Sequence, residues 1–112
     1  MSDLEKKKCR PCEGIGEKFT QKEIKEHMQQ ISQDWRLIEK ETSITKKYTF
    51  KNYYEVLAFV NAIAWVSHYE DHHPSLIVNY DHCQVTYSTH ALGGLTENDF
   101  ICATKVDGLL KS

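Results

Sequence analysis

Three segments of the chain carry the apolar periodicity and the start signals of α-helices. Each opens on Thr or Asn followed three residues later by Glu or Asp, the pattern of a capping box, whose side chains satisfy free backbone groups of the first turn. The segments cover residues 20–31, 52–71 and 96–110. The third has an acidic first turn, which the helix dipole favours. The sequence therefore predicts a short first helix, a long central helix and a C-terminal helix.

Between the predicted helices, apolar and polar residues alternate with the period of β-strands. The segments with this pattern are 35–38, 42–50, 76–80 and 84–90. The connections 39–41 and 81–83 are short, so each pair of strands forms an antiparallel hairpin. The resulting order is α-β-β-α-β-β-α. We therefore predict an α+β domain, with a four-stranded antiparallel sheet and three helices on one face of it.

The predicted central helix is apolar around its whole circumference. Val56, Phe59 and Ile63 lie on one side of it, and Trp65 and Tyr69 lie on the opposite side. A helix without a polar face is buried on all sides. The sheet covers only one of these sides, so neighbouring helices or a second subunit must cover the rest. We therefore expect a homodimer or a homotetramer.

The first part of the chain differs from the remainder. Residues 1–19 begin with several lysines, then contain glycines and a proline, and show no apolar periodicity. We expect a flexible lead-in there and a single domain over residues 20–112, because this length suffices for one core and not for two. Cys9 and Cys12 have CxxC spacing, but the chain has no second such pair and no strand is predicted before them. We interpret both as thiols in a flexible segment.

Charge and hydropathy exclude several classes of protein. A net charge of −2 provides no basic surface for direct contact with nucleic acid. The longest apolar run, residues 56–66, is interrupted by Asn61 and is too short to cross a membrane. The first residues lack the apolar segment of a signal peptide. We therefore expect a cytoplasmic protein whose four cysteines are reduced.

Histidines are concentrated where the predicted elements end. His72 and His73 stand at the exit of the central helix, because Pro74 disfavours helical geometry in the residue before it. His90 ends the last predicted strand. Imidazole gives and takes protons near neutral pH. Three rings at element ends therefore indicate acid–base catalysis or a metal site.

The remaining histidines carry weaker signals. His68 and His72 are four residues apart, so they share a face of the predicted helix at a spacing that zinc sites also use. The segment lacks the HExxH pattern of metalloproteases, because its glutamate is in another register. A small histidine-cluster metal-binding protein is therefore one alternative. We interpret His27 and His82 as surface residues, since the first has polar neighbours and the second lies in a predicted turn.

Residues 72–100 resemble the signature of the pterin-4a-carbinolamine dehydratase family. That family carries His-His-Pro, then an aromatic residue, then Ser/Thr-Thr-His, and then Gly-Leu-Thr/Ser-x-x-Asp at the separations found here. In this chain the motifs are His72-His73-Pro74, Tyr80, Ser88-Thr89-His90 and the segment from Gly94 to Asp99. Upstream, Trp35 falls where the family has a tryptophan at the start of its first strand. Residues 7–14 are similar to the N-termini of many bacterial members.

The resemblance implies the fold predicted above and a lyase reaction on a pterin. The substrate is 4a-hydroxytetrahydrobiopterin, the adduct that aromatic amino acid hydroxylases leave, and the products are quinonoid dihydropterin and water. A functional link to such a hydroxylase follows from the same resemblance. Because the pterin is the substrate, we expect no cofactor and no metal. The reaction needs one group that protonates the leaving hydroxyl and another that takes the N5 proton.

The resemblance also implies roles for individual residues. The catalytic residues are His72, His90 and His73, of which the first two form the acid–base pair and the third mainly holds the pterin. The other implied pterin contacts are Pro74, Ser88, Thr89, Ala91 and, as a pocket wall, Trp35. Asp99 is expected to accept a hydrogen bond from an imidazole and to fix its tautomer. The dipole at the end of the central helix favours a protonated ring, which makes the His72 end the proton donor and His90 the acceptor.

One position departs from the family pattern. Four residues before His72 the family usually has an acidic residue, and this chain has His68. Two protonated imidazoles on one helix face repel each other, so we expect His68 to influence His72 as a supporting residue. Animal members of the family also serve as dimerisation partners of a homeodomain transcription factor. Such a protein-binding role is a second alternative to the enzyme.

Overall fold

The fold is built on an antiparallel sheet, and the computed structural model orders its strands β1-β2-β4-β3. The structure describes residues 3–38 and 40–110. The strands are β1 (Arg36–Ile38), β2 (Ser43–Thr49), β3 (Ser75–Val78) and β4 (His82–Tyr87). The helices are α1 (Cys12–Ile15), α2 (Gln21–Met28), α3 (Tyr53–Glu70) and α4 (Glu97–Gly108), with 3₁₀ turns η1 (Asp3–Lys6) and η2 (His90–Leu92).

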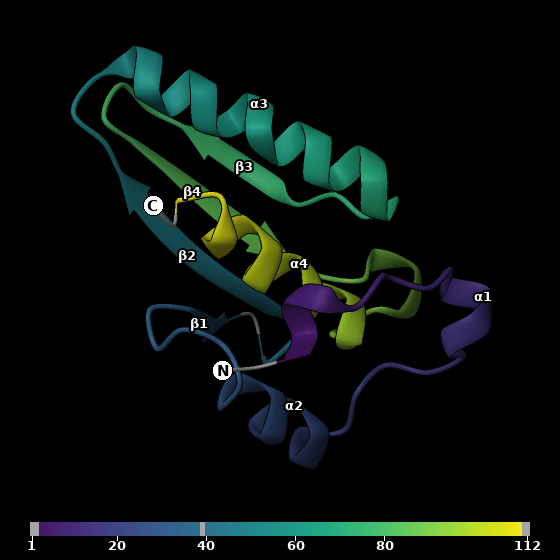
Figure 1. Ribbon diagram of the computed structural model, residues 1–112. Helices are drawn as coiled ribbons and strands as arrows, with labels where there is room; N and C mark the ends of the chain where they lie inside the picture. The colour runs from purple at the N-terminus through teal and green to yellow at the C-terminus, as the bar shows by residue number, and fades with distance from the viewer. Residues whose placement is uncertain (1–2, 39, 111–112) are drawn as a thin grey trace.

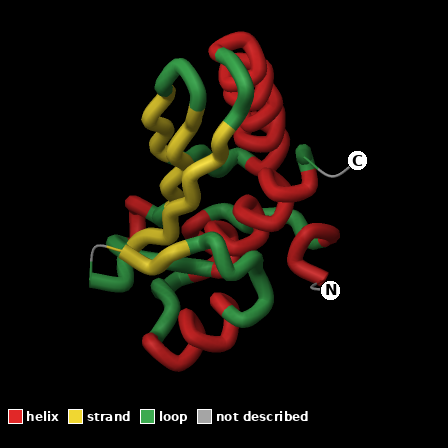
Figure 2. The backbone as a smooth tube through the Cα atoms, turned by 90° about the vertical axis from the view of Figure 1, so that its left-hand side faces the viewer, coloured by secondary structure: helices red, strands yellow, loops and turns green. Residues whose placement is uncertain are grey.

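α3 and α4 cover one face of the sheet. β4 is an inner strand, paired with β2 on one side and β3 on the other. Its alternate residues Cys83, Val85 and Tyr87 are fully buried, whereas those between them are partly exposed. Figures 1 and 2 show α3 and α4 on the same side of the sheet, and α2 lies beyond β1. The predicted α+β fold and the predicted order of its elements are confirmed.

The hydrophobic core lies between the sheet and these helices. α3 contributes Val56 and Ile63, and α4 contributes Phe100 and Val106, all of which are buried. Burying one such side chain stabilises the fold by about 1.5–3 kcal/mol relative to leaving it exposed. The core therefore packs α3 and α4 against the same strand, β4.

α3 begins and ends at residues with non-helical backbone. The Asn52 side chain accepts a hydrogen bond from the Glu55 backbone N–H at 2.9 Å and caps the first turn. At the other end, Asp71 adopts left-handed geometry with φ of 53°, which stops the helix and turns the chain toward the sheet. Both ends agree with the capping signals and with the expected helix exit.

The apolar circumference of α3 is divided between core and surface. Val56 and Phe59 are buried, whereas Tyr54, Trp65 and Tyr69 are 70–80% exposed. The sheet and α4 cover only the inward side, as expected from the sequence. The homodimer or homotetramer that would cover the outward side stays a prediction.

Several elements are shorter than predicted. α2 ends at Met28 rather than Ile31, and β3 and β4 end before residues 80 and 90. β3 stops because the Asn79 N–H donates to the His82 carbonyl and closes a tight turn. β4 stops because Thr89 leaves the sheet to form an isolated bridge with Gly94.

The N-terminal residues, which we expected to belong to a flexible lead-in, lie against α3 and α4. Leu4 of η1 is only 2% exposed and is part of the core. The backbones of Cys9 and Arg10 are hydrogen-bonded to the side chains of Glu70 and Asn98. These contacts join residues far apart in the sequence, so apolar periodicity could not indicate them.

The side chain of Cys12 lies outside the described part of the chain. Within residues 3–38 and 40–110, no helix is long and apolar enough to span a membrane.

Candidate active site

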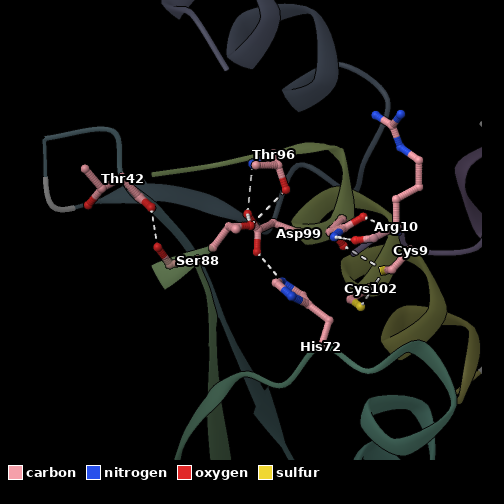
Figure 3. A network of polar contacts seen from close by, with 10 residues as sticks. Cys9, Arg10, Thr42, His72, Ser88, Thr96, Asp99 and Cys102 are labelled. Atoms are coloured by element: carbon pink, nitrogen blue, oxygen red, sulfur yellow. Dashed lines mark hydrogen bonds and ion pairs between the residues drawn. The ribbon is translucent and has the colours of Figure 1, made fainter. Parts of the chain in front are cut away.

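A buried ion pair joins the end of α3 to the start of α4. The left-handed turn at Asp71 carries His72 off the helix axis, and the His72 N–H donates to the Ser67 carbonyl at 3.2 Å. The ring then reaches across to α4, where Nε2 lies 2.6 Å from Oδ1 of Asp99 (Figure 3). The Asp99 side chain is fully buried and that of His72 is 10% exposed. A short contact of this kind is a charge-assisted hydrogen bond, in which the ring N–H donates to the carboxylate.

Asp99 is itself held by two further donors. It is the third residue of α4, and Oδ2 accepts the backbone N–H of Thr96 at 3.0 Å, as in a capping box. The Thr89 hydroxyl donates to the same oxygen at 2.9 Å and lies 2.8 Å from the Thr96 hydroxyl. Oδ1 is therefore directed at His72 by the bonds that occupy Oδ2. The carboxylate has no freedom to turn away from the ring.

This arrangement fixes the chemistry of the His72 ring. Nε2–H is engaged with Asp99, so Nδ1 is the ring nitrogen that remains for proton transfer. The ring plane lies nearly parallel to that of Tyr87, with centroids 5.8 Å apart and an angle of 9° between them. Burial, followed by the nearby Cys102 and Cys9 thiols, raises the pKa of Tyr87, so its phenol stays neutral. Tyr87 thus provides a flat, uncharged surface that sets the tilt of the imidazole.

The other histidines of the motifs lie at the surface. His73 and His90 are exposed, as is Ala91 next to His90 in η2. The Thr89 backbone bridges Gly94, and its side chain bonds Asp99. His90 therefore follows directly on a residue bonded to the partner of His72. The structure thus brings the segments that carry His72–His73 and His90 to the same end of the sheet.

Three implied pterin contacts have other partners in the structure. Thr89 is 1% exposed, and its hydroxyl donates to Asp99, so this hydroxyl faces inward instead of toward a ligand. The Ser88 hydroxyl donates to the Thr42 carbonyl at 2.8 Å. Trp35 is 2% exposed, and its indole N–H donates to Asp107 at 3.0 Å. Trp35 is accordingly a core residue, and we no longer assign it to a pocket wall.

The expected pairing of His68 with His72 is wrong. α3 ends at Glu70, so His72 lies outside the helix and the four-residue spacing does not put both rings on one face. His68 is exposed, and its ring lies 5.6 Å from that of Trp65. His68 therefore belongs to the outward side of α3.

His27 and His82 were both interpreted as surface residues. His27 is only partly exposed. Its ring packs against those of Phe19 and Phe100, at 4.5 and 5.3 Å, and its Nε2 is 3.6 Å from Glu97. Burial alone would raise the pKa of Glu97, but Lys7 and His27 beside it lower that pKa. His82 lies in the β3–β4 turn and bonds Asp81, in agreement with its interpretation.

The sequence did not identify the residues that support Asp99 and His72. Thr96 and Tyr87 are fully buried and support Asp99 and His72, respectively. Thr96 could have been found, since it starts the predicted capping box that contains Asp99. Tyr87 lies in a predicted strand, but its contact with His72 depends on how α3 ends. Among the described residues, no group of three or more His, Cys, Asp or Glu side chains is arranged to hold a metal ion.

Comparisons with known proteins identify the family of the chain. Residues 17–109 match the family model described as pterin 4 alpha carbinolamine dehydratase. A relative from Nitrosomonas europaea, whose name assigns it to the pterin-4-alpha-carbinolamine dehydratases, is 54% identical over 112 residues, covering 100% of this chain and 97% of its own. A relative of the same description from Legionella pneumophila is 50% identical over 109 residues, covering 97% of this chain and 96% of its own.

Solved structures show the same fold. The crystal structure of a transcriptional coactivator/pterin dehydratase from Brucella melitensis matches with a TM-score of 0.78 and 26% identity, covering 84% of this chain and 99% of that one. A pterin dehydratase-like protein, identified as a RuBisCO assembly factor in the alpha-carboxysome, matches with a TM-score of 0.61 and 26% identity, covering 70% and 92%. Sequence, family model and fold agree: the chain belongs to the pterin 4 alpha carbinolamine dehydratase family, a family of hydro-lyases.

Proposed function

We propose that this protein dehydrates 4a-hydroxytetrahydrobiopterin to quinonoid dihydropterin and water by histidine acid–base catalysis. The observation that carries the proposal is the His72–Asp99 bond of 2.6 Å, next to the segment that presents His90. Such a bond fixes the tautomer and the orientation of an imidazole, which a structural surface histidine does not need. The family membership supports the reaction class.

The reaction requires the transfer of two protons. The C4a hydroxyl leaves as water when an acid protonates it, and the N5 proton passes to a base as the C4a–N5 double bond forms. We assign the acid to Nδ1–H of His72, whose protonated ring the Asp99 carboxylate balances. We assign the base to His90, which is exposed and therefore reachable by a ligand. One positioned acid or base contributes about 10²–10⁴-fold to a rate.

The remaining exposed groups would bind the pterin. His73 follows His72 directly and is exposed, so its ring is accessible to the substrate. Pro74 is half-buried beside it, and Ala91 is exposed beside His90. The proposal includes a functional link to an aromatic amino acid hydroxylase, because that enzyme produces the adduct. It also includes the cytoplasmic location expected from the sequence.

Kinetics of three alanine variants test the assignment. We expect His72→Ala and His90→Ala each to lower kcat by about 10²-fold or more, and the double variant to fall to the uncatalysed rate. His73→Ala is expected mainly to raise KM, since a holding residue contributes equally to ground state and transition state. The substrate is freshly generated 4a-hydroxytetrahydropterin.

Two results would overturn the proposal. An unchanged kcat in His90→Ala would remove that residue from the mechanism. Activity that is lost with a chelator and restored by zinc would favour the histidine-cluster metal site instead.

A role in protein binding is a second candidate, favoured by the exposed aromatic residues of α3. Tyr54, Trp65 and Tyr69 are 70–80% exposed on one helix, more than a free surface usually carries. Two structurally similar proteins are described as a transcriptional coactivator/pterin dehydratase and as a RuBisCO assembly factor. A protein that lacks dehydratase activity, but whose α3 variants lose a protein partner, would support this candidate.

A further inference from the structure

Residues 4–10, which we call the N-terminal strap, lie against α3 and α4 near His72 and Asp99. The match to the family model begins at residue 17, whereas the Nitrosomonas europaea relative aligns over the whole of this chain, the strap included. Leu4 anchors one end in the core at 2% exposure. Figure 3 shows the other end, Cys9 and Arg10, beside Asp99 and His72. The strap therefore connects the hydrophobic core to the surroundings of the candidate site.

The strap is bonded to α4 through Asn98, the neighbour of Asp99. The Asn98 amide oxygen accepts the Arg10 N–H at 3.0 Å, and its amide nitrogen donates to the Arg10 carbonyl at 2.7 Å. The Cys9 sulfur lies 3.6 Å from both the Asn98 carbonyl and the Cys102 sulfur. The contact with Cys102, burial and the Glu70 carboxylate raise the pKa of Cys9, so its thiol remains protonated and able to donate.

The strap is bonded to α3 through its last turn. The Cys9 N–H donates to Oε1 of Glu70 at 2.8 Å, and Glu70 is only 6% exposed. Oε2 of the same carboxylate lies 3.6 Å from Nζ of Lys105 on α4. Lys8 donates to the Tyr69 carbonyl at 2.8 Å, and its ammonium lies 4.7 Å from the centre of the Tyr69 ring. Three hydrogen bonds of the strap backbone, together with contacts of the Lys8 and Cys9 side chains, thus join the strap to the end of α3 and the start of α4.

We propose that the N-terminal strap is a positioning element for catalysis, which holds the end of α3 at the distance from α4 that the His72–Asp99 bond requires. Glu70 stands two residues before His72, and Asn98 stands one residue before Asp99. A shift of either anchor by a fraction of an ångström would lengthen the 2.6 Å bond. Neither Glu70 nor Asn98 touches the substrate in this scheme. The inference rests on the proposed role of His72 and Asp99 in dehydration.

The test compares three variants of the full chain. Glu70→Ala removes the acceptor for the Cys9 N–H, while Glu70→Gln keeps an oxygen that can accept it. Glu55→Ala is the matched control, because Glu55 accepts the Lys51 N–H at the opposite end of α3, far along the helix from His72. Two quantities are measured: kcat with KM, and the NMR signal and exchange rate of the His72 Nε2 proton, assigned by its absence in His72→Ala.

We expect Glu70→Ala to lower kcat about tenfold with little change in KM, because misplacement by less than 1 Å costs up to about 10²-fold. Exchange of the His72 Nε2 proton should accelerate about as much, whereas Glu70→Gln should restore both values and Glu55→Ala should change neither. A Glu70→Ala protein that is destabilised but keeps its kcat and slow proton exchange would overturn the proposal. If that variant does not fold, Asn98→Ala, which removes both bonds to Arg10, is used with the same expectations. If the unaltered protein has no dehydratase activity but Glu70→Ala still accelerates proton exchange, the proposed function is refuted, whereas the positioning of His72 by the strap is supported.

Discussion

At the scale of single residues, Asp99 performs two tasks with one carboxylate. One oxygen accepts the Thr96 N–H and the Thr89 hydroxyl, and so closes the first turn of α4. The other oxygen accepts the His72 ring N–H. Because both oxygens are occupied, the residue at position 99 determines both where α4 begins and which nitrogen of His72 remains for chemistry.

We expect Asp99→Asn to lower kcat by about 10²-fold, the lower end of what a positioned acid contributes. An amide has one oxygen, so it can keep the helix cap or accept from His72, but not both, and its NH₂ group would repel the ring N–H. Steady-state kinetics measure the loss. Circular dichroism and the unfolding midpoint check that the fold is kept.

The matched control is Asp71→Asn, since Asn also adopts the left-handed backbone that Asp71 has beside the site. This variant should keep its kcat. An Asp99→Asn enzyme with unchanged kcat would show that the His72–Asp99 bond serves stability alone.

At the scale of elements, Asp107 joins α4 to the first hairpin. Its carboxylate accepts the Trp35 indole N–H at 3.0 Å, the Lys46 ammonium at 2.7 Å and the Tyr48 hydroxyl at 2.5 Å. Burial and the Asp107 carboxylate raise the pKa of Tyr48, so the hydroxyl remains a donor. Three donors from β2 and the residue before β1 thus meet at one acceptor near the end of α4.

Asp107→Ala is expected to lower the free energy of unfolding by about 2–4 kcal/mol, because the buried donors of Trp35 and Tyr48 lose their acceptor. Denaturant unfolding measures the change. Asp107→Asn keeps one oxygen and should lose less than half as much. Equal losses in both variants would mean that charge, and not the hydrogen bonds, accounts for the effect.

The elements that sequence could predict are those whose signals are local. Thr20, Asn52 and Thr96 start their helices as expected, because an N-cap depends on residues within one turn. The fold class followed from the order of these elements. The sequence did not indicate the left-handed turn at Asp71. Because of this turn, the His72 ring points away from His68 and toward Asp99.

Contacts between distant residues could not be predicted. The bond from Cys9 to Glu70 and the packing of His27 between Phe19 and Phe100 depend on tertiary structure that no periodicity encodes. The residues of the site were identified by resemblance, but not the partners of their side chains. Trp35 was therefore assigned to a pocket wall, although its ring lies in the core.

At the scale of the whole molecule, the outward side of α3 predicts self-association. Tyr54, Trp65 and Tyr69 expose most of their surface there. Sedimentation is expected to show a dimer or tetramer at micromolar concentration, because contiguous apolar surface of this kind is usually covered. Trp65→Glu should shift the equilibrium toward the monomer, since a charge would be desolvated in the interface.

Tyr80→Glu is the control for this prediction. Tyr80 is 74% exposed but belongs to the β3–β4 turn and not to α3, so its replacement should leave the assembly unchanged. A stable monomer at high concentration, in the unaltered protein, would contradict the expectation.

The burial of Asp99 links catalysis to the resistance of the molecule to heat. Its carboxylate is fully buried and bonded to α4, to the segment after β4 and to the segment after α3, so it joins three segments of the fold. Segments joined in this way open together as one cooperative unit. Loss of activity on heating should therefore coincide with global unfolding instead of preceding it, and an enzyme stabilised elsewhere in the fold should retain activity to a correspondingly higher temperature.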